Sequence, residues 1–202
     1  MQAELTGKGF AVTSKRVDLE RVAEIEELIS DTASKEFDVL VNNAAVLKYV
    51  DFLTAKVDVW NEAQNVNVRA PFLLSQSFLA HMMERNWGRI INLTSIGGQW
   101  GGTLAVPYAV SKAALIGLTR SLAKLGASRG VTVNAVSPGL VGTEILAGEV
   151  GTAEYKKKVE GIPLGRIATV EEIAGVILFL AGDAAGYITG QTLNVNGGMY
   201  FG

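Results

Sequence analysis

Three side chains in the middle of the sequence have the types and the spacing that hydride transfer to a carbonyl group requires. Tyr108 and Lys112 are four residues apart, so on an α-helix they share one face, and Ser95 lies thirteen positions before Tyr108. A phenol can donate a proton, an ammonium beside it favours the phenolate, and a hydroxyl can hydrogen-bond the same oxygen. We therefore expect Lys112 to lower the pKa of Tyr108 from about 10, which makes the phenol a usable acid near neutral pH.

The segments around these residues predict how they are brought together. The run 89–94 is apolar enough for a buried strand, and it ends at Ser95, where an open parallel sheet presents its functional groups. A glycine-rich loop follows, and Pro107, which is tolerated in a first helical turn, opens a predicted helix over residues 108–127. Tyr108 and Ser95 can therefore converge. Tyr–Lys pairs at this spacing are also common on surface helices, so the position beside Ser95 carries the argument.

Short apolar segments alternate with helical segments along the chain, which predicts an α/β fold with a doubly wound parallel sheet. The predicted strands cover residues 9–16, 38–41, 89–94, 131–136 and 191–195. The predicted helices cover residues 2–6, 20–34, 54–79, 108–127 and 170–181. With 202 residues, 49% of them hydrophobic, the chain can bury one core, and we expect a single domain over residues 1–202.

Composition argues against several classes of function. A net charge of −2 gives no general attraction to nucleic acid or to an anionic membrane. The chain has no cysteine and one histidine, His81, so we expect neither a disulfide scaffold nor a histidine metal cluster. Its first residues lack the apolar stretch of a secretion signal, and no run reaches the roughly 18 apolar residues of a membrane span. We expect a cytoplasmic protein with no metal, nucleic-acid or membrane partner.

Several motifs, taken in order, resemble the short-chain dehydrogenase/reductase family over nearly the whole chain. They are Asn42-Asn43-Ala44-Ala45 after a strand, Asn67, Ser95, Tyr108-Ala-Val-Ser-Lys112 and Pro138-Gly139. The stretches 162–166, 187–190 and 195–200 are similar to bacterial 3-oxoacyl-(acyl carrier protein) reductases. The resemblance implies a Rossmann-like sheet and an NAD(P)-dependent oxidoreductase. Such an enzyme would reduce a 3-oxoacyl thioester of fatty acid biosynthesis to the 3-hydroxyacyl form, or would act on another small ketone or secondary alcohol.

The resemblance also implies a role for each motif residue. Tyr108 would give its proton to the alcohol oxygen as hydride arrives, Lys112 would hold the nicotinamide ribose, and Ser95 would hydrogen-bond the carbonyl. Asn67 would complete a proton relay through water. The residues implied in cofactor binding are Asp18, Leu19, Asn43, Ala44, Ala45, Tyr108, Lys112, Pro138, Gly139, Val141 and Thr143. Read singly, Asp18 is equally a helix N-cap residue, and Ser95 is equally a turn residue.

The strand, glycine-rich phosphate loop, helix and second strand with which this family begins have no counterpart in the sequence. Thr6-Gly7-Lys8-Gly9 does not replace the loop, because Val12 stands where the third glycine of G-x-G-x-x-G falls. The preference between NAD and NADP is therefore unreadable, although the resemblance favours NADPH, and we expect weak cofactor binding. Two alternatives to an active enzyme stay open: a cofactor-free, catalytically silent subunit of an oligomer, and a fragment of a longer gene product.

The missing strands also leave two structural alternatives. In the family's strand order, two strands would be absent between the predicted strands 9–16 and 38–41. Either these two strands pair directly, or an apolar sheet edge is left that must pair with another chain.

Two kinds of protein partner follow from the resemblance. The segments 72–83 and 115–125 are apolar helical stretches, and the corresponding helices of the family pack in a dimer interface, so we expect a homo-oligomer. The alternative is that both helices are buried within one chain. An acyl carrier protein is the second partner, because Arg129 matches a carrier-binding arginine of the reductases, although Asn86 stands where the second such arginine falls.

Overall fold

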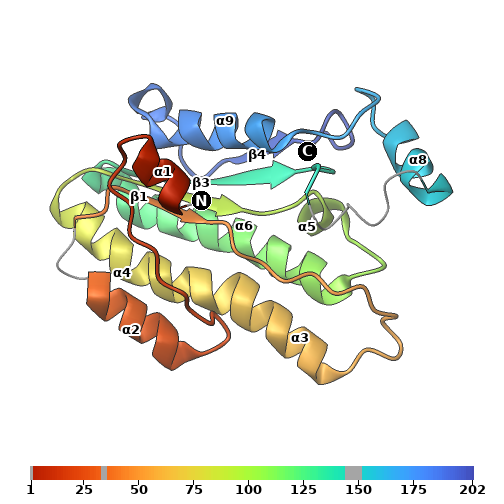
Figure 1. The fold of residues 1–202 in the computed structure, drawn as a ribbon, viewed down its shortest axis with the longest axis horizontal. Helices are drawn as coiled ribbons and strands as arrows, with labels where there is room; N and C mark the ends of the chain where they lie inside the picture. Colours follow the sequence, from red (N-terminus) through yellow and green to blue (C-terminus); the bar gives the residue numbers. More distant parts are fainter. Residues whose placement is uncertain (1, 33–35, 144–151) are drawn as a thin grey trace.

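The computed structural model describes residues 2–32, 36–143 and 152–202, and within them four parallel strands form one sheet (Figure 1). The strands are β1 (Val39–Asn42), β2 (Gly88–Leu93), β3 (Val131–Pro138) and β4 (Thr192–Val195). They lie in the order β1-β2-β3-β4, and every neighbouring pair is parallel. The predicted α/β fold with a parallel sheet is therefore confirmed.

Helices connect the strands and cover both faces of the sheet. They are α1 (Gln2–Gly7), α2 (Val22–Thr32), α3 (Val57–Gln64), α4 (Ala70–Glu84), α5 (Gly97–Trp100), α6 (Val106–Gly126), α8 (Ala153–Glu160) and α9 (Val170–Ala181). A π-helical turn, η1 (Asn65–Arg69), joins α3 to α4, and two 3-10 turns are η2 (Ala127–Arg129) and η3 (Asp183–Ala185). The sequence patterns did not predict α5 or α8. None of the helices in the described part of the chain is both long and apolar enough to cross a membrane.

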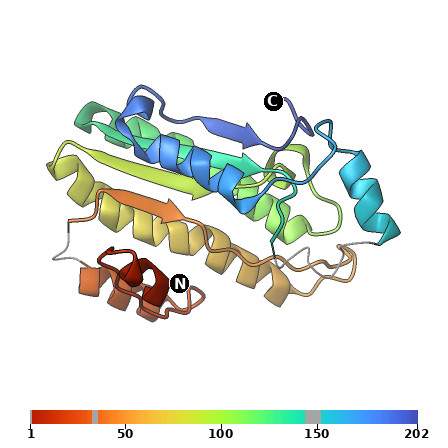
Figure 2. The ribbon, with the colours of Figure 1, turned by 45° about the horizontal axis from the view of Figure 1, so that its top comes forward.

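Alternate side chains of β2 pack into two separate cores, one on each face of the sheet. Ile90 contacts the core that α4 and α6 cover, together with Met82 and Val133. Ile91 points the other way and packs against α9, where Leu180 is fully buried. Successive side chains of a strand face opposite sides, so a strand buried on both faces is apolar throughout. Figure 2 shows the resulting three layers, with α9 on one side of the sheet and α4 and α6 on the other.

The register of the strands brings their carboxyl ends to one edge of the sheet. Leu93 at the end of β2 lies opposite Val136 of β3, and the backbone N–H of Thr94 donates to the carbonyl of Val136 at 2.8 Å. One step further, the N–H of Ile96 donates to the carbonyl of Pro138 at 3.1 Å. The loops that follow β2 and β3 therefore leave the sheet side by side.

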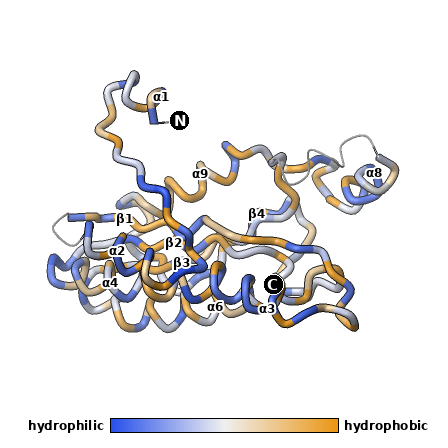
Figure 3. The backbone as a smooth tube through the Cα atoms, turned by 60° about the horizontal axis from the view of Figure 1, so that its bottom comes forward, coloured by the Kyte–Doolittle hydropathy of each residue, from blue (hydrophilic) through white to orange (hydrophobic). Residues whose placement is uncertain are grey.

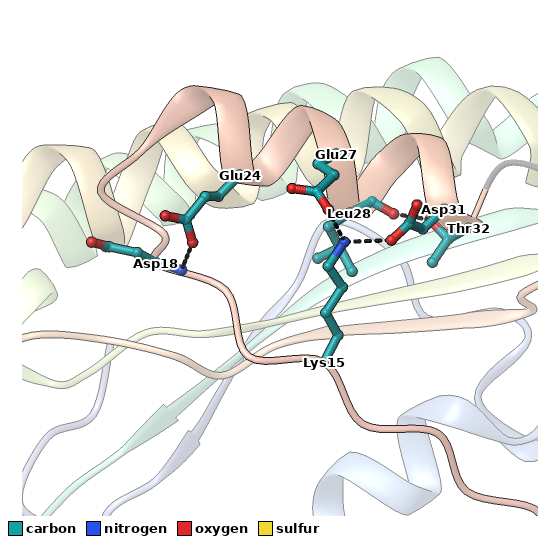
Figure 4. Close-up of polar contacts among 7 residues, drawn as sticks. All are labelled: Lys15, Asp18, Glu24, Glu27, Leu28, Asp31 and Thr32. Carbon is teal, nitrogen blue, oxygen red and sulfur yellow. Dashed lines mark hydrogen bonds and ion pairs between the residues drawn. The ribbon is translucent and has the colours of Figure 1, made fainter.

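The predicted strand over residues 9–16 is wrong, because residues 10–18 form an extended arm without strand pairing. The arm forms polar contacts with α2 and does not pair with a strand (Figure 4). The ammonium of Lys15 pairs with the carboxylates of Glu27 and Asp31, and the N–H of Asp18 donates to Glu24 at 2.7 Å. Figure 3 shows α1, which precedes the arm, standing away from the layers.

With the arm unpaired, β1 is an edge strand of the sheet. Val39 and Val41 on this strand keep 36% and 39% of their surface exposed. Of the two alternatives, direct pairing of the strands 9–16 and 38–41 is therefore wrong. The helix predicted over residues 20–34 is present from Val22 to Thr32, and its predicted end at Ser34 lies outside the described residues.

Candidate active site

A cavity of about 560 Å³ opens at the carboxyl ends of β2 and β3. Its walls come from the loop after β1, from residues 94–105, from the start of α6, from residues 138–143 and from the loop after β4. Ser95 and Tyr108 both line it, so the structure brings these two predicted residues together. Among the described residues that line the cavity, none carries a charged side chain.

Lys112 lies behind Tyr108, away from solvent. Its side chain is 2% exposed, and its ammonium donates to the backbone carbonyl of Leu93 at 2.7 Å. The same nitrogen lies 5.5 Å from the centroid of the Tyr108 ring. Burial lowers the pKa of Lys112 to about 8, because the charged form loses its hydration. Near neutral pH the side chain is still mostly a cation, and it lies next to the phenol as the spacing predicts.

The expected effect of Lys112 on the acidity of Tyr108 is wrong. Burial raises the pKa of Tyr108, the hydrogen bond with Ser95 lowers it in part, and the nearby phenol of Tyr49 raises it further. Sequence spacing could not predict the dominant cause, because burial depends on how α6 packs in the folded chain. A raised pKa keeps the phenol protonated at neutral pH, which is the form that a proton donor needs.

Asn67 occupies the π-helical turn η1 and is fully buried. Its Oδ1 accepts from the N–H of Val46 at 2.8 Å, and its Nδ2 donates to the carbonyl of Val46 at 3.0 Å and to Oγ of Ser111 at 2.9 Å. Ser111 in turn donates to the carbonyl of Tyr108 at 2.7 Å. Both amide hydrogens of Asn67 thus have protein partners, and the side chain connects the loop after β1 to the first turn of α6.

Two close approaches fix the short helix α5, which follows Ser95. A Cβ on Gly98 would lie 2.7 Å from the carbonyl carbon of Lys112, so only glycine allows α5 to lie this close to α6. On the other side, Nε2 of Gln99 donates to Ser137 at 2.8 Å and to Asn194 at 2.5 Å. These contacts join α5 to α6, β3 and β4, and they hold Ser95 in place at the end of β2.

The residues implied in cofactor binding fall into two groups. Pro138, Gly139, Val141 and Thr143 line the cavity that Tyr108 and Ser95 share. Leu19, Asn43 and Ala44 line a second cavity of about 290 Å³ between the arm and β1, together with Lys15.

Asp18 and Ala45 line neither of these two cavities. The carboxylate of Asp18 instead accepts from the N–H of Glu20 at 3.0 Å and pairs with Arg21 at 3.4 Å, just before α2. Because α2 begins at Val22, Asp18 is not the N-cap residue of that helix, and its carboxylate belongs to the turn before it.

Several lining residues of the first cavity were not predicted from the sequence. They are Leu47, Tyr49, Trp100, Leu104 and Met199. Trp100 ends the short helix α5 and the others lie in loops, and only the folded sheet gathers them at one edge, so neither periodicity nor a motif identifies them. Most are apolar, and Tyr49 is the exception that carries a hydroxyl.

Comparison with known proteins finds relatives over most of the chain. A family profile described as enoyl-(acyl carrier protein) reductase matches residues 2–200. The 3-oxoacyl-[acyl-carrier-protein] reductase FabG of Aquifex aeolicus is 46% identical over 164 residues, which are 81% of this chain and 65% of that protein. The chain thus spans less than two thirds of the length of this relative.

Solved structures are also similar to the chain. One from Beutenbergia cavernae, assigned as an NAD(P)-dependent gluconate 5-dehydrogenase with NADP bound at low occupancy, has a TM-score of 0.94 and 36% identity. The alignment covers 98% of this chain and 80% of that one. Another, described as a short chain dehydrogenase/reductase family protein, has a TM-score of 0.84 and 34% identity, and the match covers 92% of this chain and 76% of that one.

Proposed function

The chain belongs to the short-chain dehydrogenase/reductase family, and from this premise we propose that it reduces the ketone of a 3-oxoacyl thioester with an NAD(P) cofactor. One observation carries the proposal. The proton donor Tyr108 and its partner Ser95 open into an apolar cavity that also contains Pro138 and Gly139 of the cofactor group. A ketone bound there would lie beside an acid, a hydroxyl and the nicotinamide end of the cofactor site.

The residues present fit the two ends of a dinucleotide. Pro138, Gly139 and Thr143 would hold the nicotinamide end, while Asn43 and Ala44 would hold the adenine end in the second cavity. When bound, the reduced cofactor supplies the hydride. NADP is bound at low occupancy in the Beutenbergia structure, which supports NADPH over NADH as the cofactor of the present chain.

The chain's own residues would manage the proton. As a C–H bond forms at the ketone carbon, the carbonyl oxygen takes the hydrogen of the Tyr108 hydroxyl, and the phenolate left behind takes up a proton from solvent in the open cavity. Ser95 hydrogen-bonds the developing alkoxide, and the Lys112 cation stabilises the phenolate. Asn67 positions Tyr108 through Ser111 and is a positioning residue.

The lining of the cavity supports an acyl substrate over a sugar acid. Gluconate carries a carboxylate, and burying a charged group costs much free energy unless an opposite charge pairs with it. The described lining offers Leu47, Leu104, Leu140 and Met199 and no charged side chain. An aliphatic acyl chain can bury its surface against these residues, which favours binding by roughly 25 cal/mol per Å² of apolar surface.

The acyl carrier partner has less support than the acyl group itself. Arg129 ends η2, immediately before β3 begins, whereas the cavity lies at the opposite end of β3. Seven residue steps of a strand separate these ends, about 23 Å at roughly 3.3 Å each. Within one chain, Arg129 is thus remote from the mouth of the active-site cavity. We therefore propose small thioesters as the first substrates to test.

Consumption of NADPH measured by absorbance is the direct test. We expect oxidation of NADPH with an acetoacetyl thioester and little with 5-ketogluconate at equal concentration. Tyr108→Phe should lower the rate by about 10²- to 10⁴-fold while leaving the thermal midpoint unchanged, because only the acid is lost. Faster turnover of 5-ketogluconate would overturn the substrate assignment, and an active Tyr108→Phe variant would overturn the assignment of the acid. Absence of nucleotide binding would favour the silent subunit.

A further inference from the structure

Tyr49 places a second phenol at the cavity that contains Tyr108. It follows β1 by seven residues and lines the cavity together with Leu47 from the same loop. Its side chain is 58% exposed although it lies at a cavity wall. The hydroxyl forms no hydrogen bond within the described part of the chain. The Tyr49 hydroxyl can therefore both donate a hydrogen bond to a ligand and accept one from it.

The loop that carries Tyr49 is fixed on both sides of this residue. The backbone of Val46 accepts and donates hydrogen bonds with the amide of Asn67, at 2.8 and 3.0 Å. The N–H of Val50 donates to the carbonyl of Leu104 at 2.9 Å. Between them, the ammonium of Lys48 pairs with Glu62. None of these contacts uses the Tyr49 side chain, so the loop is positioned independently of the phenol.

Two polar side chains of the cavity near the reacting ketone are already hydrogen-bonded, whereas the hydroxyls of Thr103 and Thr143 also line it. Ser95 accepts from the N–H of Gly97 at 3.1 Å and interacts with Tyr108. Thr94 donates its hydroxyl to the carbonyl of Val136 at 2.9 Å. Most of the other described lining residues are aliphatic, aromatic or glycine. A substrate with a second oxygen thus meets a free phenol at Tyr49.

We propose that Tyr49 is a specificity-determining residue that donates a hydrogen bond to the second carbonyl of a 1,3-dicarbonyl substrate. This inference rests on the proposed function and adds to it the recognition of the thioester end. A 3-oxoacyl thioester has its ketone and its thioester carbonyl separated by one methylene. Tyr49 and Tyr108 line the same cavity and interact electrostatically, so each oxygen would have a phenol of its own. A simple ketone can use Tyr108 but has no group for Tyr49.

Direct binding without cofactor provides the first test. The probes are the acetoacetyl thioester of N-acetylcysteamine and a matched monoketone in which a methylene replaces the thioester carbonyl. Calorimetry, or fluorescence of the cavity residue Trp100, gives the dissociation constant of each. Tyr49→Phe should weaken binding of the thioester about 2- to 12-fold, the range for one neutral hydrogen bond, and leave binding of the monoketone unchanged.

Kinetics and a matched control complete the test. With NADPH, Tyr49→Phe should raise KM for the thioester and change KM for the monoketone little, with an intact kcat for both. Tyr187→Phe, at a fully exposed tyrosine that does not line the cavity, should change neither probe. Equal effects of Tyr49→Phe on both probes, or no effect on either, would overturn the inference, as would a wild-type chain that binds neither probe. A wild-type chain that binds the thioester but does not reduce it would instead overturn the proposed function and leave the role of Tyr49 standing.

Discussion

The side-chain amide of Asn67 hydrogen-bonds both polar backbone groups of Val46, accepting from its N–H at 2.8 Å and donating to its carbonyl at 3.0 Å. This pair joins the π-helical turn after α3 to the loop after β1. A π-helical turn makes room for one more residue than an α-helical turn, and such turns are frequent at functional sites. Here the turn presents the amide of Asn67 to the loop on one side and to Ser111 of α6 on the other.

Replacing Asn67 by alanine should destabilise the chain and displace the loop. Three hydrogen bonds would be lost, at about 1 kcal/mol each, so we expect unfolding free energy to fall by about 2 to 4 kcal/mol. Urea denaturation monitored by circular dichroism measures this loss. Asn65→Ala is the control, because the side chain of this neighbour in the same turn has no hydrogen bond to another described residue. A similar loss in both variants would contradict the assignment.

The buried ammonium of Lys112 should make stability depend on pH in the alkaline range. Its pKa is about 8 in the folded chain and 10.5 when exposed, so between these values the unfolded chain holds a proton that the folded chain lacks. Above pH 10.5 the group is neutral in both states and costs no stability. As pH falls from 10.5 to 8 the unfolding free energy decreases by about 3 kcal/mol.

Lys112→Met isolates this effect, since the other titrating groups are shared. The unfolding free energy of the variant minus that of the wild type should be largest below pH 8 and should shrink as pH rises to 10. Chemical denaturation at pH 7 and pH 10 measures the difference. A difference that stays constant across this range would show that Lys112 is not buried as a cation.

Gly98 should tolerate no side chain. Alanine there would place its Cβ 2.7 Å from the Lys112 backbone, so α5 must move away from α6 and shift Ser95 with it. We expect Gly98→Ala to lower kcat at least about 10-fold and to reduce stability by about 1 to 3 kcal/mol, the usual cost of overpacking. Gly117→Ala is the matched control, because nothing lies within 4 Å of its Cβ position on α6, and it should raise stability by up to about 1 kcal/mol. Equal behaviour of the two variants would contradict the close approach.

Nucleotide binding should be limited by the charges of the second cavity. Lys15 lines this cavity, but its ammonium is paired with Glu27 and Asp31. We therefore expect weak binding of NADPH and NADH by calorimetric titration. Glu27→Gln combined with Asp31→Asn frees the ammonium and should tighten binding by about 10- to 100-fold, the range for one charge-assisted hydrogen bond. Micromolar binding by the wild type, or no gain in the double variant, would contradict this account.

Exposed apolar side chains on α4 and α6 lead us to propose a homo-oligomer. Phe72 on α4 and Leu125 on α6 are 47% and 61% exposed, whereas Leu115 and Leu122 of α6 are buried within the chain. Sedimentation of the wild type at micromolar concentration should show an oligomer, and Leu125→Glu should shift it toward monomer. Leu178→Glu, on α9 at the other face of the sheet, should not. A wild-type monomer would show that both helices serve one chain only.

Sequence predicted those parts of the site that depend on short spacing. Tyr108 and Lys112 share a helix face, and Ser95 follows the end of β2, so local rules are enough to bring them together. The direction of the Tyr108 pKa shift was wrong because burial depends on the packing of distant elements. The strand predicted over residues 9–16 failed for a similar reason, since an apolar extended segment becomes a strand only beside a partner. Tyr49 was missed because a loop carries no periodic pattern.

The free edge of β1 gives the sheet an alternating pattern of hydrogen exchange. The carbonyl of Asp38 accepts a hydrogen bond from the N–H of Arg89 in β2. The backbone groups of successive residues in a strand point to opposite sides. The N–H of Leu40 therefore faces β2, while the N–H groups of Val39 and Val41 face outward. Deuterium should therefore enter quickly at the two valines and slowly at the leucine between them. Any chain or ligand that comes to lie along β1 would slow the two valines alone, so these amides report directly on whether the edge is covered.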